Sequence, residues 1–133
     1  MQIAARVSNT PSGHKVEVET DSRKQSIEIL PKSAGRGSSV NGGELLFAAL
    51  ATCFCNDVYR EATKRDIDVQ DVKVEVTGTF GNAGEPARDI SYRVEVGASA
   101  SKTAIDDLIR ATDSLTEIQN TLRGGCGVRL ILG

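Results

Sequence analysis

Two cysteines, Cys53 and Cys55, are the residues best suited to chemistry in this chain of 133 residues. Both lie in the segment 42–65, which reads GGELLFAALATCFCNDVYREATKR and is apolar from residue 45 to residue 55 apart from Thr52. An apolar run of this length with no internal Gly or Pro predicts a helix, buried on every side in its first half. Residues two apart on a helix point about 200° away from each other, so these thiols cannot form a disulfide together while the helix stands.

The helical neighbours of Cys53 decide how reactive its thiol is. Apolar residues precede it, and Asn56 and Asp57 follow within one turn. Apolar and anionic surroundings raise a thiol pKa, so a reactive Cys53 needs a cation from another segment. The candidates by chemistry are Arg36, His14, Arg6 and Arg23. Without such a cation, a buried cysteine most often has only a packing role.

The segments before the helix are expected to form strands and a loop. Val16 and Val18 alternate with charged residues, a pattern of half-buried antiparallel strands. Turn-forming residues at 9–13 and 20–22 divide the first thirty residues into three strands. A Gly/Ser-rich loop follows, and Asn41 is expected to cap the helix with Glu44 reaching back to it.

The segments after the helix predict a hairpin and a second helix. Residues 72–77 and 90–96 alternate between apolar and polar side chains, and the turn-rich sequence GNAGEP separates them. Ser101 is expected to open an amphipathic helix.

Two further elements are expected near the C-terminus. Ser114 and Glu117 have the spacing of a capping box, which predicts either a short third helix or a broken continuation of the second. Alternating apolar residues at 128–132 predict a last strand. The resulting order, β-β-β-α-β-β-α-(α)-β, indicates a single α+β domain over residues 1–133 with mainly antiparallel sheets.

Composition excludes several classes of protein. The net charge is −2 with both signs interspersed, so we expect no nucleic-acid partner. The apolar run falls well short of the roughly 20 residues needed to span a bilayer, so no membrane partner is expected. The N-terminus lacks a signal-peptide pattern, which indicates a cytoplasmic location.

The burial pattern of the helix also predicts a partner. A helix that is apolar on all sides needs more cover than one curved sheet and one amphipathic helix can supply. A homodimer that buries this helix between two subunits would supply the rest.

Two blocks of the sequence resemble the OsmC-like family, which includes organic hydroperoxide resistance proteins and osmotically inducible proteins. The first block runs from Glu44-Leu45-Leu46 to Ala51-Thr52-Cys53-Phe54 and is followed by Asp57; the second is Gln119-Asn120-Thr121-Leu122-Arg123. The resemblance implies an intertwined homodimer, with sheets wrapped around a long central helix that bears the cysteine.

The resemblance also implies a site. In the peroxidase branches, a cysteine at the position of Cys53 attacks a hydroperoxide as a thiolate and becomes a sulfenic acid. A second cysteine then closes a disulfide, which an external dithiol reduces. A Glu near the start of the helix and an N-terminal Arg lower the pKa of the first thiol, which makes Glu44 a candidate catalytic residue beside Cys53. Neither a cofactor nor a metal is expected.

This chain departs from the peroxidase pattern at three places. Thr116 stands where the second cysteine is expected, and Cys126 comes ten residues later. The family's Glu aligns with Gly43, so Glu44 is one place late. The N-terminal segment in which the family has its Arg reads TPSGHK in this chain, so it offers His14 or Lys15 but no Arg.

Three hypotheses remain open. The first is a thiol-dependent peroxidase with Cys53 as nucleophile, resolved by Cys126, by Cys55 after local unwinding, or by an external thiol. The second is a non-peroxidase protein that binds a small apolar or thiol-reactive ligand at the dimer interface, oriented by Asn56 and Asp57. The third, a metal site, is disfavoured because cysteines that diverge on a helix cannot share an ion. The accessory candidates are Cys55, Cys126, Asn56, Asp57, His14 and Arg36.

Overall fold

The computed structural model describes residues 1–133 and divides into two compact units, residues 1–45 and residues 46–133. The long helix α1 (Gly42–Lys64) runs through the boundary between them. The expectation of one domain over the whole chain stays a prediction.

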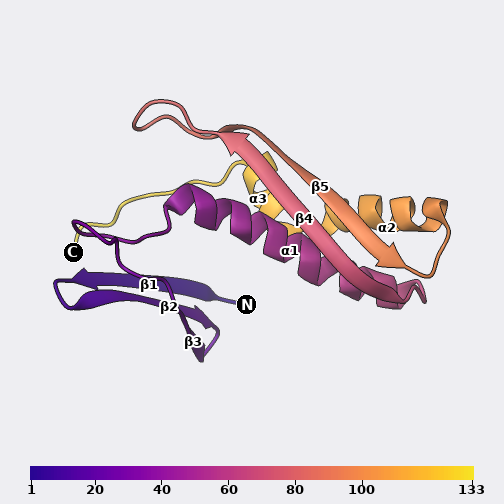
Figure 1. Ribbon diagram of the computed structural model, residues 1–133, viewed down its shortest axis with the longest axis horizontal. Helices are drawn as coiled ribbons and strands as arrows, with labels where there is room; N and C mark the ends of the chain where they lie inside the picture. Colours follow the sequence, from indigo (N-terminus) through magenta and orange to yellow (C-terminus); the bar gives the residue numbers. More distant parts are fainter. The chain divides into compact units, whose positions relative to one another are not determined.

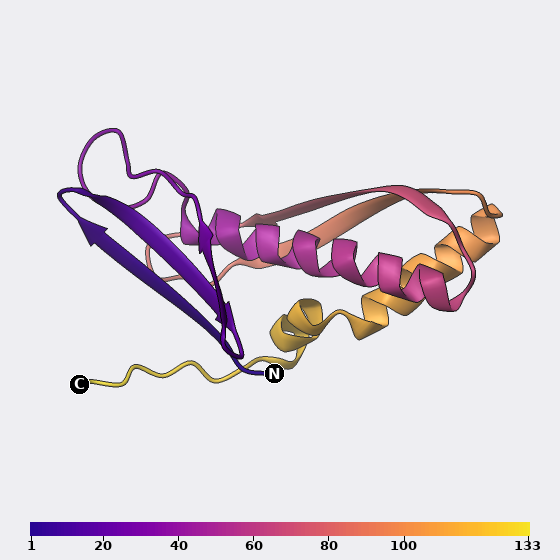
Figure 2. The ribbon, with the colours of Figure 1, turned by 90° about the horizontal axis from the view of Figure 1, so that it is seen from below.

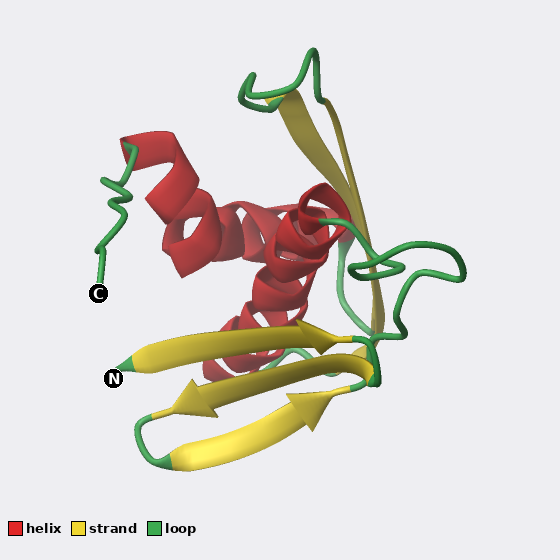
Figure 3. Cartoon of the chain, turned by 90° about the vertical axis from the view of Figure 1, so that its left-hand side faces the viewer, coloured by secondary structure: helices red, strands yellow, loops and turns green.

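The first unit contains a three-stranded antiparallel sheet in the order β1-β2-β3, as predicted (Figure 3). Its strands are β1 (Ile3–Thr10), β2 (Gly13–Thr20) and β3 (Arg23–Ile27). The register places Val7, Val16 and Ile27 in one row across the sheet, so they share a face. Residues 11–12 and 21–22 form the two turns, which confirms their predicted positions.

The N-terminus of α1 has the predicted capping box. The Asn41 side-chain oxygen Oδ1 accepts a hydrogen bond from the Glu44 N–H at 2.8 Å. The Glu44 carboxylate oxygen Oε2 accepts one from the Asn41 N–H, also at 2.8 Å. This reciprocal pair satisfies N–H groups that have no partner within the helix.

The second unit packs a hairpin against helices. Strands β4 (Val69–Thr79) and β5 (Arg88–Ala98) form the predicted antiparallel pair and lie along α1 (Figure 1). Helices α2 (Lys102–Leu115) and α3 (Glu117–Gly124) complete the unit (Figure 2). The core consists of Phe54, Val58 and Ala62 from α1 and Leu108 from α2, with alternate apolar side chains of the hairpin packed on them. The α+β class with antiparallel sheets and a long central helix is thus confirmed.

Burial on α1 follows a stripe and does not surround the first half of the helix. Leu50 and Phe54 are buried, whereas Leu45 remains 42% exposed and Ala48 and Thr52 are also exposed. The expectation of all-round burial is therefore wrong within one chain, because the surrounding elements cover only part of the helix.

The last strand is absent. Residues 125–133 form no strand, and Val128, Leu130, Ile131 and Leu132 are between 77% and 96% exposed. The alternating pattern is present, but a strand also needs a neighbour to accept its backbone hydrogen bonds. No strand of this chain pairs with the segment.

The third helix forms where expected but with a different start. Thr116 occupies the N-cap position of α3, and the Ser114 hydroxyl instead donates a hydrogen bond to the Ala111 carbonyl at 2.7 Å. The predicted capping box between Ser114 and Glu117 is therefore wrong, and this leaves the Glu117 carboxylate free for other contacts. None of the helices is long and apolar enough to cross a membrane.

The C-terminus of α1 provides a stability test. The N–H of Ile67 bonds to the Ala62 carbonyl at 3.0 Å, while Asp66 adopts a left-handed conformation with φ of 54°. Glycine is the residue that usually occupies this position, because it has no Cβ to clash there. Asp66→Gly should raise the free energy of unfolding by roughly 0.5–1 kcal/mol in urea denaturation.

Asp68→Gly is the matched control, because Asp68 is also exposed and has no positive φ. It should lower stability or leave it unchanged. Destabilisation by Asp66→Gly would contradict the account of this helix end.

Candidate functional site

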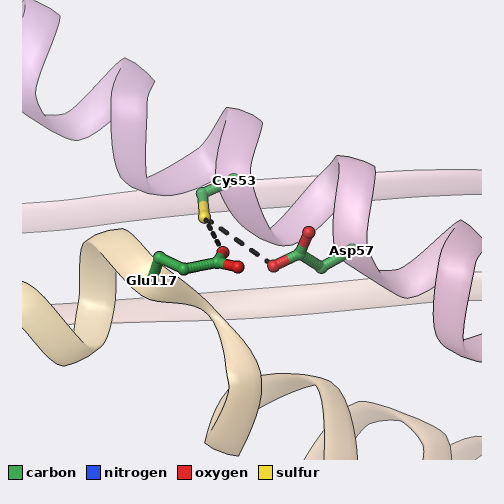
Figure 4. Close-up of side chains that lie close together, drawn as sticks. All are labelled: Cys53, Asp57 and Glu117. Atoms are coloured by element: carbon green, nitrogen blue, oxygen red, sulfur yellow. Dashed lines mark hydrogen bonds between the residues drawn. The ribbon is translucent and has the colours of Figure 1, made fainter. Parts of the chain in front are cut away.

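The Cys53 side chain meets two carboxylates (Figure 4). Its sulfur Sγ lies 3.8 Å from Asp57 Oδ2 and 3.7 Å from Glu117 Oε2, and the thiol can donate a hydrogen bond to either. Asp57 is one helical turn further along α1, so helix geometry alone brings it to the cysteine. Glu117 comes from the start of α3, 64 residues away in sequence.

A buried hydrogen bond holds α3 against α1. The side-chain nitrogen Nε2 of Gln119 donates to the Leu50 carbonyl at 3.0 Å, and Gln119 is only 3% exposed. Because Glu117 lies two residues before Gln119 in the same short helix, this contact fixes the position of its backbone beside Cys53.

A second network ties α3 to α2 and β5. Asp113 of α2 accepts a hydrogen bond from the Tyr92 hydroxyl and lies 2.6 Å from a terminal nitrogen of Arg123. Burial raises the pKa of the Asp113 carboxyl, but the hydrogen bonds from Tyr92 and Arg123 outweigh it and lower that pKa overall. The helix that carries Glu117 is thus held at both ends.

Arg60 is the cation of this site. One of its terminal nitrogens lies 2.9 Å from Asp57 Oδ1 and 3.9 Å from Glu117 Oε1. The Asp57 side chain is almost fully buried, and a buried carboxylate requires such a partner. Arg60 therefore forms ion pairs with the two carboxylates that contact the thiol.

The environment keeps the thiol protonated. Burial raises the pKa of Cys53 most strongly, and the charges of Asp57 and Glu117 raise it further. Backbone N–H groups of Ile118 and Glu117, at the start of α3, act in the opposite direction because they favour the thiolate. The net pKa is above the ordinary value.

The two carboxyl groups differ in charge state. Burial and the neighbouring charge of Glu117 raise the pKa of Asp57, although Arg60 partly offsets this. The pKa of Glu117 is lowered, first by its own backbone N–H and also by Cys53 and Arg60. Glu117 is therefore the ionised acceptor of the pair, and Asp57 takes up a proton more readily.

The same three residues could hold a metal ion. One ligand atom from each of Cys53, Asp57 and Glu117 lies within 4.8 Å of the other two. A thiolate and two carboxylates suit a divalent transition metal. However, Arg60 already supplies the positive charge to both carboxylates, so a cation would have to displace its guanidinium.

Comparison with known proteins agrees with this arrangement of elements. The family described as OsmC-like protein matches residues 35–130. The chain belongs to the OsmC-like family. No curated relative matched the sequence.

Solved OsmC-like structures share the fold. An OsmC-like protein from Mycoplasma pneumoniae has a TM-score of 0.66 at 21% identity, covering 92% of this chain and 86% of that one. An OsmC-like hydroperoxide resistance protein from Jannaschia gives 0.60 at 15% identity, with 98% and 91% covered. The organic hydroperoxide resistance protein OhrB of Bacillus subtilis gives 0.54 at 16% identity, with 92% and 90% covered.

The predicted site residues on α1 and near the C-terminus have separate environments. Asp57 is the predicted residue that contacts Cys53. Cys55 is half-buried, and Asn56 and Cys126 are exposed. Cys53, Cys55 and Cys126 are all free thiols.

The predicted residues of the first unit have partners there. Asn9 joins His14 and Arg36, with 3.1 Å from its Nδ2 to His14 Nδ1 and 3.1 Å from its Oδ1 to Arg36 Nε. Glu44 is engaged in the helix cap. Arg6, another candidate cation, forms ion pairs with Glu17 and Glu19.

Sequence reasoning did not identify Glu117 and Arg60 as site residues. Arg60 is seven residues after Cys53, a spacing that places both on one face of the helix, and this signal was available in the sequence. Thr116 stands where the family's second cysteine is expected, and Glu117 is the next residue. The spacing of Glu117 from Ser114 indicated a helix cap instead of a site residue.

Removing the charge of Glu117 should make the thiol more reactive. Glu117→Gln removes one of the two charges that raise the Cys53 pKa, so the pH profile of iodoacetamide alkylation at Cys53 should shift to lower pH. Arg60→Gln should shift it to higher pH, because both carboxylates lose their cation. Peptide mass spectrometry would follow Cys53 separately from the other two thiols.

Glu95→Gln is the matched control, because it removes the same charge from an exposed position of β5 and should leave the profile unchanged. A profile for Glu117→Gln that is unchanged or shifted to higher pH would refute the proposed electrostatic role.

Proposed function

We propose that this OsmC-like protein is a thiol-dependent peroxidase that reduces organic hydroperoxides through Cys53. Relatives with the same fold are hydroperoxide resistance proteins, which supports this class of reaction. The observation that carries the proposal is the placement of a half-buried Cys53 thiol beside an ionised acceptor, Glu117, and the N–H groups at the start of α3.

The chemical step uses these groups. The Cys53 sulfur attacks the outer oxygen of the hydroperoxide, and the O–O bond breaks as the S–O bond forms. The Glu117 carboxylate accepts the thiol proton through its existing hydrogen bond and returns it to the departing alkoxide. The thiol and hydroperoxide thus become a sulfenic acid and an alcohol, and the oxidised group is the sulfur.

An external thiol then completes the cycle. A first thiol condenses with the sulfenic acid and releases water, and a second thiol reduces the mixed disulfide and restores Cys53. An external reductant is the simplest choice because Thr116 occupies the family's second-cysteine position, and Cys126 lies in the exposed segment after α3. Cys55 is two residues from Cys53 on the same helix and points away from it.

Peroxidase turnover with cumene hydroperoxide and a dithiol reductant tests the proposal. Cys53→Ser should abolish consumption of the hydroperoxide, while Cys126→Ser and Cys55→Ser should retain it. Because the thiol pKa is raised, the wild-type rate should increase as pH rises above neutral and more thiolate forms. Turnover that survives Cys53→Ser would exclude this mechanism.

A second candidate is a non-peroxidase protein that binds a small apolar or thiol-reactive ligand at Cys53. The raised pKa of the thiol favours the apolar ligand, because a protonated thiol is a poor nucleophile and packs as a small apolar group. In this case the purified protein should not consume any hydroperoxide at any pH. Native mass spectrometry should then detect a ligand that is lost in Cys53→Ala.

We also propose that the chain forms a homodimer. The alternating segment 128–132 exposes four large apolar side chains, and Leu45 on α1 is also exposed, so apolar surface remains that a second copy could cover. The backbone groups of this segment, which lack a strand partner in the chain, could then pair with the second copy.

Charge placed in this segment should weaken the dimer. The double variant Leu130→Glu and Leu132→Glu should shift the mass from dimer toward monomer in sedimentation equilibrium, because two buried charges would oppose association. Thr103→Glu with Thr121→Glu adds the same charge at exposed helical positions and should leave the dimer intact. A wild-type protein that is monomeric at all concentrations would exclude this proposal.

A further inference from the structure

The first unit contains a polar pocket that shares no residue with the Cys53 site. It lies between the β1–β2 turn and the loop that follows β3, and its volume is about 180 Å³. The charged residues of its lining are Lys32 and Arg36, and the lining contains no acidic residue. Because drug-sized ligands need larger sites, this volume suits a small polyatomic ion or a single charged group of a ligand.

Hydrogen bonds to Asn9 hold the Arg36 guanidinium in place. Its Nε donates to Asn9 Oδ1 at 3.1 Å, and its terminal nitrogen Nη2 donates to the Asn9 carbonyl at 3.2 Å. The N–H of Gly37 donates to the same Oδ1 at 3.2 Å, so the loop is held at the same point as the side chain. A guanidinium has five N–H groups, and Asn9 accepts from only two of them, which leaves the others free for a ligand.

The Lys32 side chain lies against the same part of the loop. Its backbone N–H donates to the Gly37 carbonyl at 3.0 Å, and its Cε lies 3.9 Å from where a Cβ on Gly37 would be. The ion pairs of the first unit are confined to strands β1 to β3, so neither Lys32 nor Arg36 has an acidic partner. Two cations are thus held beside one glycine without a counter-charge, and an anion is the ligand that they attract.

The lining also contains uncharged donors. The backbone N–H groups of Gly35 and Arg36 donate to no group of the chain. Gly35 and Gly37 have φ values of 82° and 101°, and loops with such left-handed residues commonly present successive N–H groups to an anion. The hydroxyls of Thr10 and Ser12 share one hydrogen bond of 2.9 Å in which either can be the donor, so one O–H is left for a ligand.

All of these free groups are hydrogen-bond donors, and two of them carry positive charge. We propose that the pocket between the β1–β2 turn and residues 31–37 binds a phosphate group. At neutral pH a phosphate group carries about two negative charges and has only acceptor oxygens, which matches two cations surrounded by donors. Arg36 supplies the planar donor pair that suits an oxyanion, and Lys32 supplies a mobile ammonium. This binding is additional to the proposed peroxidase function and does not rest on it.

NMR titration of ¹⁵N-labelled protein with inorganic phosphate tests the site. The amide resonances of Gly35, Arg36 and Gly37 should shift and reach saturation. Ionic strength is held constant with sodium chloride, because added salt screens exposed charges by itself. Acetate, which carries one charge, should bind several-fold more weakly at the same ionic strength.

Glycerol 3-phosphate distinguishes the two sources of a phosphate group. If it binds at least as tightly as inorganic phosphate, the ligand is a phosphate ester. If it binds more weakly, the ligand is the free ion. Both results support the site.

Two variants and a control distinguish the site from unspecific binding. Arg36→Gln should weaken phosphate binding about fivefold, the loss expected for one exposed charge contact. Lys32→Gln should have a similar effect, and it leaves the loop folded because the Lys32 ammonium has no hydrogen bond within the chain. Arg23→Gln, which removes an exposed guanidinium of the same unit outside the pocket, should leave binding unchanged.

The proposal is overturned if phosphate gives no saturable shifts at residues 35–37, or if acetate binds as tightly as phosphate. It is also overturned if Lys32→Gln and Arg23→Gln have equal effects. Cys53→Ser protein should bind phosphate like the wild type, so failure of this site and failure of the peroxidase function are distinguishable.

Discussion

The contact between α3 and α1 is the constraint on which the site depends. The bond from Gln119 to the Leu50 carbonyl fixes the first turn of α3, and the pairing of Arg123 with Asp113 fixes its end. Glu117 and the free N–H groups of that first turn therefore meet Cys53. The same bond aims the Gln119 nitrogen at α1 and leaves its oxygen Oε1 buried without a hydrogen-bond partner.

This contact brings opposing electrostatic effects to one sulfur atom. Backbone N–H groups favour the thiolate, whereas burial and the two carboxylates favour the thiol and prevail. Arg60 lies beside the carboxylates, so it moderates their charge without a hydrogen bond to the sulfur. Burial has the largest effect on the reactivity of Cys53, and the degree to which the charges of Asp57 and Glu117 are neutralised adjusts it further.

Most of the fold could be predicted from local sequence patterns. Alternation and turn residues located β1 to β5, and the Asn41–Glu44 box marked the start of α1, because these signals depend on near neighbours in sequence. The segment 128–132 has the pattern of a strand, but pairing depends on a partner that a pattern does not reveal. Its expected strand is not formed within this chain.

The site was predictable only where it depends on helix geometry. Asp57 could be assigned to Cys53 because residues four apart on a helix are neighbours. Glu117 could not be, because its approach depends on how α3 packs on α1, and its distance from Ser114 matched a local motif equally well. The buried acceptor of Gln119 likewise follows from packing and has no sequence signature.

The pKa of Cys53 in the wild-type protein is the most direct test of the central claim, that two carboxylates and burial keep this thiol protonated. The ¹³Cβ chemical shift of Cys53, followed across pH by NMR, reports its ionisation without a chemical probe. The account predicts a transition above the ordinary range of a cysteine thiol. A transition at or below neutral pH would contradict it.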